Sequence, residues 1–326
     1  MWTDIDRIIA SNQTFVITSH IHPDGDAIGT ELALCEFLRA RGKDATIINT
    51  SPTPVIYRFL DPGGMMRAPA SQEDLPRITA ADAILIVDIN DWKRLGMIGD
   101  TVRTSPAAKA VIDHHPYQDT IVPTTVIDVK ASSTAELMYD LITSLGGPLT
   151  RPAANGLYTG ILTDTGSFRF GNTTPTAHTI TARLLEAGVQ PAAIYDFVYN
   201  QNSEARLRLM GRVLSDMTIA YRGQVAWIVV TQQLFKETGA LPEDTSSLVD
   251  ATLTIAGVEI GLIFVETAEG TIRVSLRSRG RQDVNKIAGA LGGGGHRAAS
   301  GAVLPGPLDD AIRRVTGAIE ATMNAE

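Results

Sequence analysis

The sequence predicts an α/β protein with a mainly parallel sheet in its N-terminal domain and a smaller α+β domain at its C-terminal end. In the first half, short strand-like runs are apolar throughout and alternate with helical patterns, which is typical of parallel strands covered on both faces. In the second half, strand-like runs follow one another in pairs joined by short turns. The chain has 326 residues, 44% of them hydrophobic, so each half is long enough to form its own core.

The predicted strands of the first half are short and hydrophobic. They cover residues 15–18, 45–48, 83–87 and 110–112. A helix over residues 26–42 follows the first of them, because Ile28 and Leu32 recur at helical spacing. Further helical patterns cover residues 132–145, 151–163, 174–187 and 203–215.

The second half is predicted to form a separate, smaller domain. Residues 217–230 indicate two strands around a turn at 221–224, and residues 258–266 and 271–277 indicate another pair. Helical patterns follow at 283–290 and 308–322. We therefore place the N-terminal domain at residues 1–188, a helical linker at 189–215 and the C-terminal domain at 216–326.

Composition and charge exclude several classes of protein. Lysine and arginine number 28 against 36 acidic residues, and the net charge of −8 does not suit a protein that wraps a long polyanion. The single cysteine, Cys35, excludes a disulfide framework and fits a reducing compartment. Because the sequence shows neither an apolar run of about 18 residues nor a signal-peptide pattern at its start, we expect a cytoplasmic protein without a membrane partner.

Histidines and aspartates gather directly after the predicted strands. The segment from His20 to Asp26 follows the first strand, Asp88 follows the third and the segment from Asp113 to His115 follows the fourth. Ligands of open parallel sheets bind beyond the carboxyl ends of the strands. One such turn alone is more often an ordinary surface loop. Three of them at one sheet edge predict a site for a divalent transition metal such as manganese, iron, cobalt or zinc.

Two further segments carry chemistry. Asp164 lies at a predicted helix end that Gly166 interrupts. A run of four glycines precedes His296, and without side chains its backbone amides can approach an anion, although a glycine run can also be a flexible loop. Residues 271–297 around it hold six cationic side chains against Asp283 alone. The cationic residues are Arg273, Arg277, Arg279, Arg281, Lys286 and Arg297. This local basic region suits a small phosphorylated substrate.

Taken together, these segments resemble the DHH phosphoesterase family, and within it the NrnA-type oligoribonucleases. The resemblance spans nearly the whole chain. Its motifs are His20-Ile21-His22-Pro23-Asp24-Gly25-Asp26, Val87-Asp88, Asp113-His114-His115-Pro116, Thr163-Asp164-Thr165-Gly166 and the glycine run ending at His296. The last of these is the signature of the DHH-associated C-terminal domain.

The resemblance implies a role for each motif residue. His20 and Asp24 would hold one divalent metal ion, and Asp26, His114 and Asp164 would hold a second. Asp88 would bridge both ions, which are expected to be manganese. Asp113 would support the site, and His115 would face the substrate phosphate. The nucleotide would contact Arg277, Arg279, His296 and the amides of Gly292, Gly293, Gly294 and Gly295.

The implied function is hydrolysis of short oligoribonucleotides to mononucleotides and of 3′-phosphoadenosine 5′-phosphate to AMP. One alternative is a phosphodiesterase for linear or cyclic dinucleotides. A RecJ-type single-strand exonuclease or a family II-type pyrophosphatase fits less well, since the former is longer and the latter lacks the glycine-rich motif. A non-catalytic nucleotide-binding protein fits least, because every expected metal ligand is present. The resemblance also makes a homodimer plausible.

Overall fold

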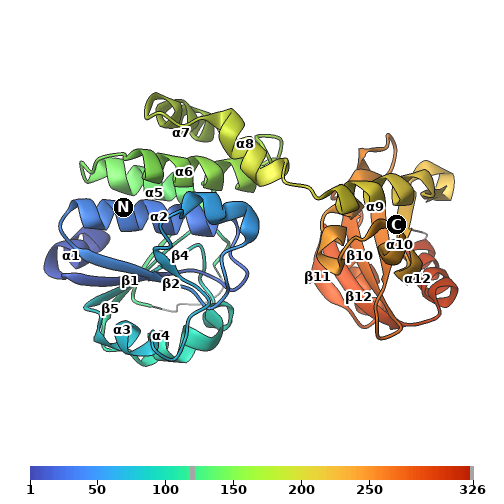
Figure 1. The fold of residues 1–326 in the computed structure, drawn as a ribbon, viewed down its shortest axis with the longest axis horizontal. Helices are drawn as coiled ribbons and strands as arrows, with labels where there is room; N and C mark the ends of the chain where they lie inside the picture. The colour runs from blue at the N-terminus through green and yellow to red at the C-terminus, as the bar shows by residue number, and fades with distance from the viewer. Residues whose placement is uncertain (118–121, 324–326) are drawn as a thin grey trace. The chain divides into compact units, whose positions relative to one another are not determined.

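The computed structural model describes residues 1–117 and 122–323, which form two compact units (Figure 1). The units cover Met1–Gln201 and Asn202–Glu326. Each contains a six-stranded sheet, parallel in the first unit and mixed in the second, so the predicted α/β class is confirmed. The units divide within the predicted linker, whose helices α8 (Pro191–Tyr199) and α9 (Glu204–Ser215) belong to different units.

The N-terminal sheet has the strand order β3-β2-β1-β4-β5-β6, with every neighbouring pair parallel. Its strands are β1 (Thr14–Thr18), β2 (Asp44–Ile48), β3 (Met66–Arg67), β4 (Ala83–Val87), β5 (Ala108–Asp113) and β6 (Thr124–Ile127). The predicted strands correspond to β1, β2, β4 and β5. The sequence did not reveal β3, which is two residues long, or β6, whose residues are only half-buried.

Helices cover both faces of this sheet, and apolar residues point alternately into two cores. Along β1, Phe15 and Ile17 enter one core while Val16 enters the other. Figure 1 shows α2 (Gly25–Ala40) between the sheet and the pair α5 (Thr134–Ser144) and α6 (Arg151–Asp164). The remaining helices of this unit are α1 (Thr3–Ser11), α3 (Leu75–Ala80), α4 (Gly99–Thr104), α7 (Pro175–Glu186) and the 3₁₀ segments η1 (Val55–Leu60) and η2 (Trp92–Ile98).

Helix α2 packs unusually closely against α6. A Cβ atom on Gly29 would lie 2.0 Å from the carbonyl oxygen of Gly156, so only glycine allows the two backbones to approach this far. The close packing continues to the N-terminal end of α2 and the C-terminal end of α6, where a Cβ atom on Gly25 would lie 2.5 Å from Thr163 Oγ1. Both ends carry predicted metal ligands.

The C-terminal unit is built on a sheet of order β11-β12-β10-β9-β8-β7. Its strands are β7 (Thr218–Ala220), β8 (Val225–Val230), β9 (Ile260–Glu266), β10 (Thr271–Ser278), β11 (Gly294–His296) and β12 (Ala299–Pro305). One core joins the sheet to α11 (Val284–Ala290) and α12 (Leu308–Met323), and the other joins it to α9 and α10 (Gln232–Thr238). Short 3₁₀ segments are η3 (Tyr221–Gly223), η4 (Pro242–Thr245) and η5 (Leu248–Thr254). Within the described residues, no helix combines the length and hydropathy needed to cross a membrane.

Candidate metal centre

The candidate centre lies at the carboxyl edge of the N-terminal sheet, where the strand order reverses between β1 and β4. This reversal leaves room for a ligand, because the chain leaves the neighbouring strands in opposite directions. His20 follows β1, Asp88 follows β4, and His114 follows β5. Hydrophobic β-strands therefore determine where these polar side chains meet.

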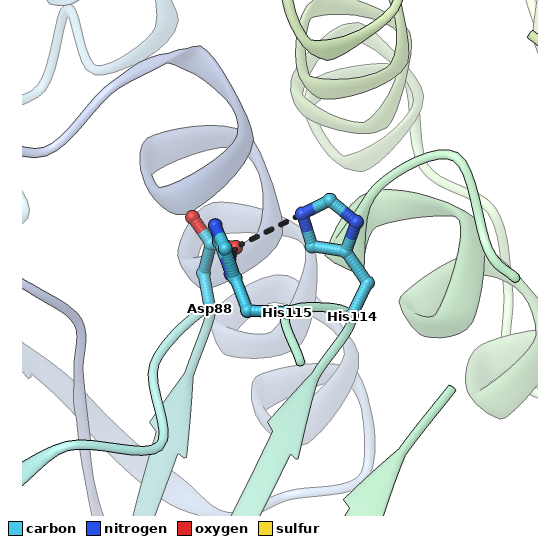
Figure 2. Close-up of side chains that lie close together, drawn as sticks. All are labelled: Asp88, His114 and His115. Atoms are coloured by element: carbon cyan, nitrogen blue, oxygen red, sulfur yellow. Dashed lines mark ion pairs between the residues drawn. The ribbon is translucent and has the colours of Figure 1, made fainter. Parts of the chain in front are cut away.

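The ligand atoms fall into three overlapping groups, in each of which they lie within 4.8 Å of one another. The groups are His20, Asp24 and Asp88; Asp26, His114 and Asp164; and Asp88, His114 and His115. The structure thus brings together all the metal ligands that the resemblance implies. Figure 2 shows Asp88 at the end of one strand facing His114 and His115 at the end of the next.

Helix ends place the carboxylates of the centre. Asp24 is the N-cap of α2, and its Oδ1 accepts hydrogen bonds from the amides of Asp26 and Ala27 at 3.0 and 3.1 Å. Asp26 in turn accepts hydrogen bonds from the first amides of α5, those of Thr134 and Ala135, at 2.6 and 2.8 Å. Asp24 thereby orders the helix end that carries Asp26, and α5 orients the Asp26 carboxylate.

Asp88 has a backbone conformation that few residues adopt. Its φ of 61° lies in the left-handed region, which costs energy for a non-glycine residue. Its amide donates to the carbonyl oxygen of Ile112 at 2.9 Å, and the Thr134 hydroxyl donates to its Oδ1 at 2.8 Å. These contacts hold the strained residue and leave Oδ2 directed at His20 Nε2, which lies 3.3 Å away.

Two atoms at the middle of the centre are buried without a hydrogen-bond partner within the described residues: Asp88 Oδ2 and His114 Nε2. Nε2 of His114 lies 3.3 Å from Asp164 Oδ2, 3.8 Å from Asp88 Oδ1 and 3.9 Å from Asp26 Oδ2. Buried polar atoms normally have a partner. Imidazole nitrogens and carboxylate oxygens that converge in this way fit a divalent transition metal.

The carboxyl groups of the centre are difficult to ionise together. Burial, followed by the negative charge of Asp24, raises the pKa of Asp26 to about 7. Burial and the charges of Asp26 and Asp24 raise the pKa of Asp164 to about 8. The same causes place the pKa of Asp88 well above its ordinary value. A cation at this point would offset both the cost of burying these carboxylates and the repulsion between them.

Two of the three histidines of the centre, His20 and His114, are suited to be ligands. Burial lowers the pKa of both His20 and His114, so the neutral ring is favoured. His20 Nδ1 lies 2.8 Å from the carbonyl oxygen of Ile21. A proton on Nδ1 would donate to that carbonyl and leave a lone pair on Nε2, the atom that faces Asp88.

His115 differs from its neighbour because it is paired with Asp113. Its Nδ1 lies 2.8 Å from Asp113 Oδ1, and its amide also donates to that oxygen at 3.1 Å. Asp113 is fully buried and accepts a further hydrogen bond from Asn90. The hydrogen bond to Asp113 raises the pKa of His115. Burial opposes ionisation of Asp113, but its hydrogen bonds hold its pKa below the usual value.

Sequence reasoning did not assign a role to Thr134, Asn90 or Arg94. Thr134 contacts both Asp26 and Asp88, and its only sequence signal is its place after the helix cap Ser133. The positive charge of Arg94 opposes protonation of both His20 and His115, so the guanidinium lies near both rings. These residues act across long sequence separations, which local patterns do not show.

The residues predicted to bind the nucleotide lie in the C-terminal unit. Arg277 on β10 is opposite Ala299 on β12, and Ala299 is opposite His296 on β11. Because directly paired residues point to the same face of a sheet, Arg277 and His296 share one face. Arg277 lines a pocket of about 220 Å³ and lies 3.6 Å from Asp250, while Arg279 is exposed and donates to the carbonyl oxygen of Leu253.

The fold requires glycine at residues 292, 293 and 295, for different structural reasons. A Cβ atom on Gly293 would lie 2.1 Å from the carbonyl oxygen of Gly301, and one on Gly295 would lie 2.6 Å from that of Ala299. Gly292 has a φ of 81°. Gly294 is exposed, and a Cβ atom there would meet nothing closer than 3.9 Å. Only at Gly294, therefore, does the fold itself not require glycine.

We expect Gly294→Val to separate substrate binding from folding. Valine suits a strand and has space here, so the melting temperature should stay within about 2 °C of the wild type, which for a protein of this size is about 1 kcal/mol or less. The side chain would project on the face that carries Arg277 and His296, and the Michaelis constant for a dinucleotide should rise severalfold. The matched control, Gly293→Ala, should lower the melting temperature. An unchanged Michaelis constant in Gly294→Val would exclude close approach of substrate to this strand.

Comparison with known proteins supports a family assignment. The model of the DHH family N-terminal domain matches residues 14–161, and that of the DHHA1 domain matches residues 224–325. The chain is 34% identical to the bifunctional oligoribonuclease and PAP phosphatase NrnA of Thermus thermophilus, covering 93% of this chain and 88% of that protein. It is 29% identical to the Bacillus subtilis protein of the same name, covering 93% of each.

A solved structure shows the same fold throughout. The exopolyphosphatase-related protein from Bacteroides fragilis is 32% identical and superimposes with a TM-score of 0.91, covering 98% of this chain and 95% of that one. The matched family domains include every strand end of the candidate metal centre and the whole glycine run. The chain belongs to the DHH family.

Proposed function

We propose that this protein is a metal-dependent phosphoesterase that hydrolyses short oligoribonucleotides to mononucleotides and converts 3′-phosphoadenosine 5′-phosphate to AMP. The observation that carries the proposal is the convergence of three histidine–aspartate groups at the reversal point of a parallel sheet. The names of the relatives in Thermus thermophilus and Bacillus subtilis support the choice of substrates.

The donor set supports two divalent ions, with manganese as the expected metal. His20 and Asp24 would hold one ion and Asp26, His114 and Asp164 the other, with Asp88 shared between them. When bound, such ions supply positive charge for the phosphate and activate water for in-line attack. Mixed imidazole and carboxylate ligands favour a divalent transition metal over calcium or magnesium, which prefer oxygen alone.

His115 and Asp113 would act on the substrate rather than on the metal. With Nδ1 committed to Asp113, the other ring nitrogen of His115 is available to donate a hydrogen bond to a phosphate oxygen. Asp113 would keep the ring oriented and favour its protonated, positively charged form. Such a donor stabilises the negative charge that develops in the transition state.

We propose that residues 1–188 hold the metals and that residues 216–326 bind the nucleotide, with 189–215 as the linker. Arg277, Arg279, His296 and the amides of Gly292, Gly293, Gly294 and Gly295 would contact phosphate and sugar groups. The single cysteine, which is buried, supports the cytoplasm as the location. A homodimer stays a prediction, which sedimentation equilibrium would check.

The length of the RNA substrate tests the function directly. A compact basic region neutralises few phosphates, so we expect the initial rate to fall steeply beyond about five nucleotides. Rates would be measured with manganese at fixed salt on RNAs from two to twenty nucleotides. The panel would include 3′-phosphoadenosine 5′-phosphate, linear and cyclic dinucleotides, and pyrophosphate.

Each outcome of that panel has a definite meaning. Fast cleavage of dimers and of 3′-phosphoadenosine 5′-phosphate supports the proposal. A rate that stays flat or rises with length would indicate a RecJ-type exonuclease, and a preference for cyclic dinucleotides would indicate the alternative phosphodiesterase.

Arg277→Ala should raise the Michaelis constant for dinucleotides without changing the metal content, because a charge-assisted contact to phosphate is lost.

A further inference from the structure

Glu31 is a fully buried acid in α2 that the proposed mechanism does not use. Its side chain is 0% exposed, and no ion pair found among the described residues involves it. Burying a lone carboxylate is costly unless it is protonated or well hydrogen-bonded. The hydrogen-bond partners of Glu31 therefore indicate its structural role.

The partner of Glu31 is Asn49, at the end of β2. Nδ2 of Asn49 lies 2.8 Å from Glu31 Oε2, and Oδ1 lies 3.2 Å from the amide nitrogen of Ser19. The Ser19 amide can only donate, so Oδ1 accepts from it and Nδ2 must donate to Glu31. The backbone of Asn49 is itself fixed by hydrogen bonds with Arg67 and Ala70. The Asn49 side chain thus connects Glu31 to the amide of Ser19, the residue directly before His20.

The remaining atoms of this group can accommodate a proton on Glu31. Glu31 Oε1 and the Ser19 hydroxyl oxygen are both buried and lack a hydrogen-bond partner within the described residues. The Ser19 hydroxyl lies close enough to Glu31 to influence its pKa. Because Oε2 already accepts from Asn49, a proton on Oε1 could donate to the Ser19 oxygen and satisfy both atoms.

The electrostatics agree with a neutral Glu31. Burial raises its pKa to about 8, although its contacts with Asn49 and Ser19 oppose that rise. A negative charge on Glu31 would act on the Cys35 thiol, one turn further along α2. The pKa of that thiol is raised mainly by burial. At neutral pH, most of Glu31 is therefore in the protonated form.

We propose that Glu31, as a neutral carboxylic acid, is a positioning residue that fixes Ser19 through Asn49 and so orients His20 for metal binding. This role rests on the proposed function of His20 as a ligand. Glu31 lies outside the groups of ligand atoms at the centre. It acts through the backbone that carries His20, much as outer hydrogen bonds orient the ligands of other metal sites.

Three variants test this role. Glu31→Gln reproduces the neutral acid, since its amide can donate to Ser19 while its oxygen accepts from Asn49. Glu31→Met keeps the approximate volume but removes both hydrogen bonds. Cys35→Ala is the control, because it removes a fully buried side chain from the same helix without touching Asn49.

Two measurements on each variant separate positioning from simple packing. The first is hydrogen exchange of peptides that cover Ser19 in the metal-free protein, and the second is the dissociation constant for manganese from calorimetry. Glu31→Met should expose the Ser19 amide to faster exchange and weaken manganese binding by about tenfold, the lower end for lost outer hydrogen bonds. Glu31→Gln should match the wild type in both. Cys35→Ala should lose stability but change neither.

The dependence of the unfolding free energy on pH supplies an independent test. The unfolded chain ionises Glu31 near its ordinary pKa of 4.5, whereas the folded chain holds the proton until about pH 8. The folded state therefore loses stability as pH rises between those values. Relative to Glu31→Gln, which has no such group, the wild type should lose unfolding free energy progressively from about pH 5 to pH 8.

The results that would overturn the proposal are distinct. Wild-type exchange and manganese affinity in Glu31→Met would show that the network positions nothing, and a Gln variant as impaired as Met would exclude the neutral acid. If Glu31→Met does not fold, Asn49→Ala replaces it, because it removes the side chain that joins Glu31 to Ser19. It should then expose Ser19 to faster exchange and weaken manganese binding, and wild-type values of both would refute the role. If the wild type itself binds no manganese and cleaves no substrate, the proposed function is wrong. The hydrogen-exchange data would still show whether Glu31 fixes Ser19.

Discussion

Replacing Asp88 by asparagine is expected to lower turnover by about a hundredfold or more while the fold stays intact. The substitution keeps the size of the side chain and the hydrogen bond from Thr134. Asparagine also tolerates the left-handed backbone that Asp88 adopts. It removes the negative charge that would be shared by two cations, whose separation in such sites is about 3.5–4 Å. The loss should appear as lower manganese content and a lower kcat.

The same substitution should have the opposite effect on the stability of the metal-free protein. The pKa of Asp88 lies well above its ordinary 3.8, because of burial and then of the charges of Asp26 and Asp24. Above pH 4 the unfolded chain releases this proton while the folded chain retains it, so the group costs stability as pH rises. With metal removed by a chelator, Asp88→Asn should melt above the wild type at pH 7. Added manganese should reverse that order, since it stabilises only a chain that binds it.

A matched control makes the Asp88 result specific. Asp128 also follows a strand of the same parallel sheet, β6, but its side chain accepts a hydrogen bond from the amide of Lys130 and belongs to none of the ligand groups. Asp128→Asn should retain manganese and activity. Near-normal turnover of Asp88→Asn in manganese would contradict the bridging role, whatever its melting temperature.

The sequence predicts the architecture of the centre better than its detail, for a physical reason. Buried parallel strands must be apolar along their length, so β1, β4 and β5 are visible as runs, and the polar residues after them must meet at one edge. That argument needs no contact information. It places His20, Asp88 and the Asp113–His115 segment together.

What the sequence leaves open depends on packing between distant segments. The amides that hold Asp26 come from α5, more than a hundred residues away. The route from Glu31 through Asn49 to Ser19 joins a helix to two strand ends and has no periodic pattern. The glycine run appeared as a possible loop, but Gly294–His296 form an edge strand because β12 offers a partner. Local propensity cannot reveal these contacts.

The paired histidines should respond differently to removal of their side chains. His114→Ala should lower the manganese content and slow every substrate, because its buried Nε2 has no hydrogen-bond partner within the described residues and lies 3.3 Å from Asp164 Oδ2. His115→Ala should keep its manganese but lose about 2.7–4 kcal/mol of transition-state stabilisation, the usual contribution of a donor to developing charge. That loss corresponds to a fall in kcat of about 10²–10³. Metal analysis and steady-state kinetics on the same preparations would measure both.

His178→Ala is the control for this pair, since His178 is exposed and stacks on Phe168 away from the ligand groups. It should retain both manganese and activity. Equal manganese loss in His114→Ala and His115→Ala would show that His115 is a ligand too, as its place near Asp88 and His114 also permits. The division of roles would then be wrong.

The pH profile provides a second test of His115. The hydrogen bond to Asp113 raises the pKa of His115, so the ring stays protonated to higher pH than an ordinary histidine. If the protonated ring is the donor, activity should fall as pH rises through that raised pKa. Asp113→Asn removes the partner charge and should move the alkaline limb of kcat/KM to lower pH, with manganese retained. A limb that stays in place in Asp113→Asn would mean that another group controls it, and that His115 does not donate as a cation.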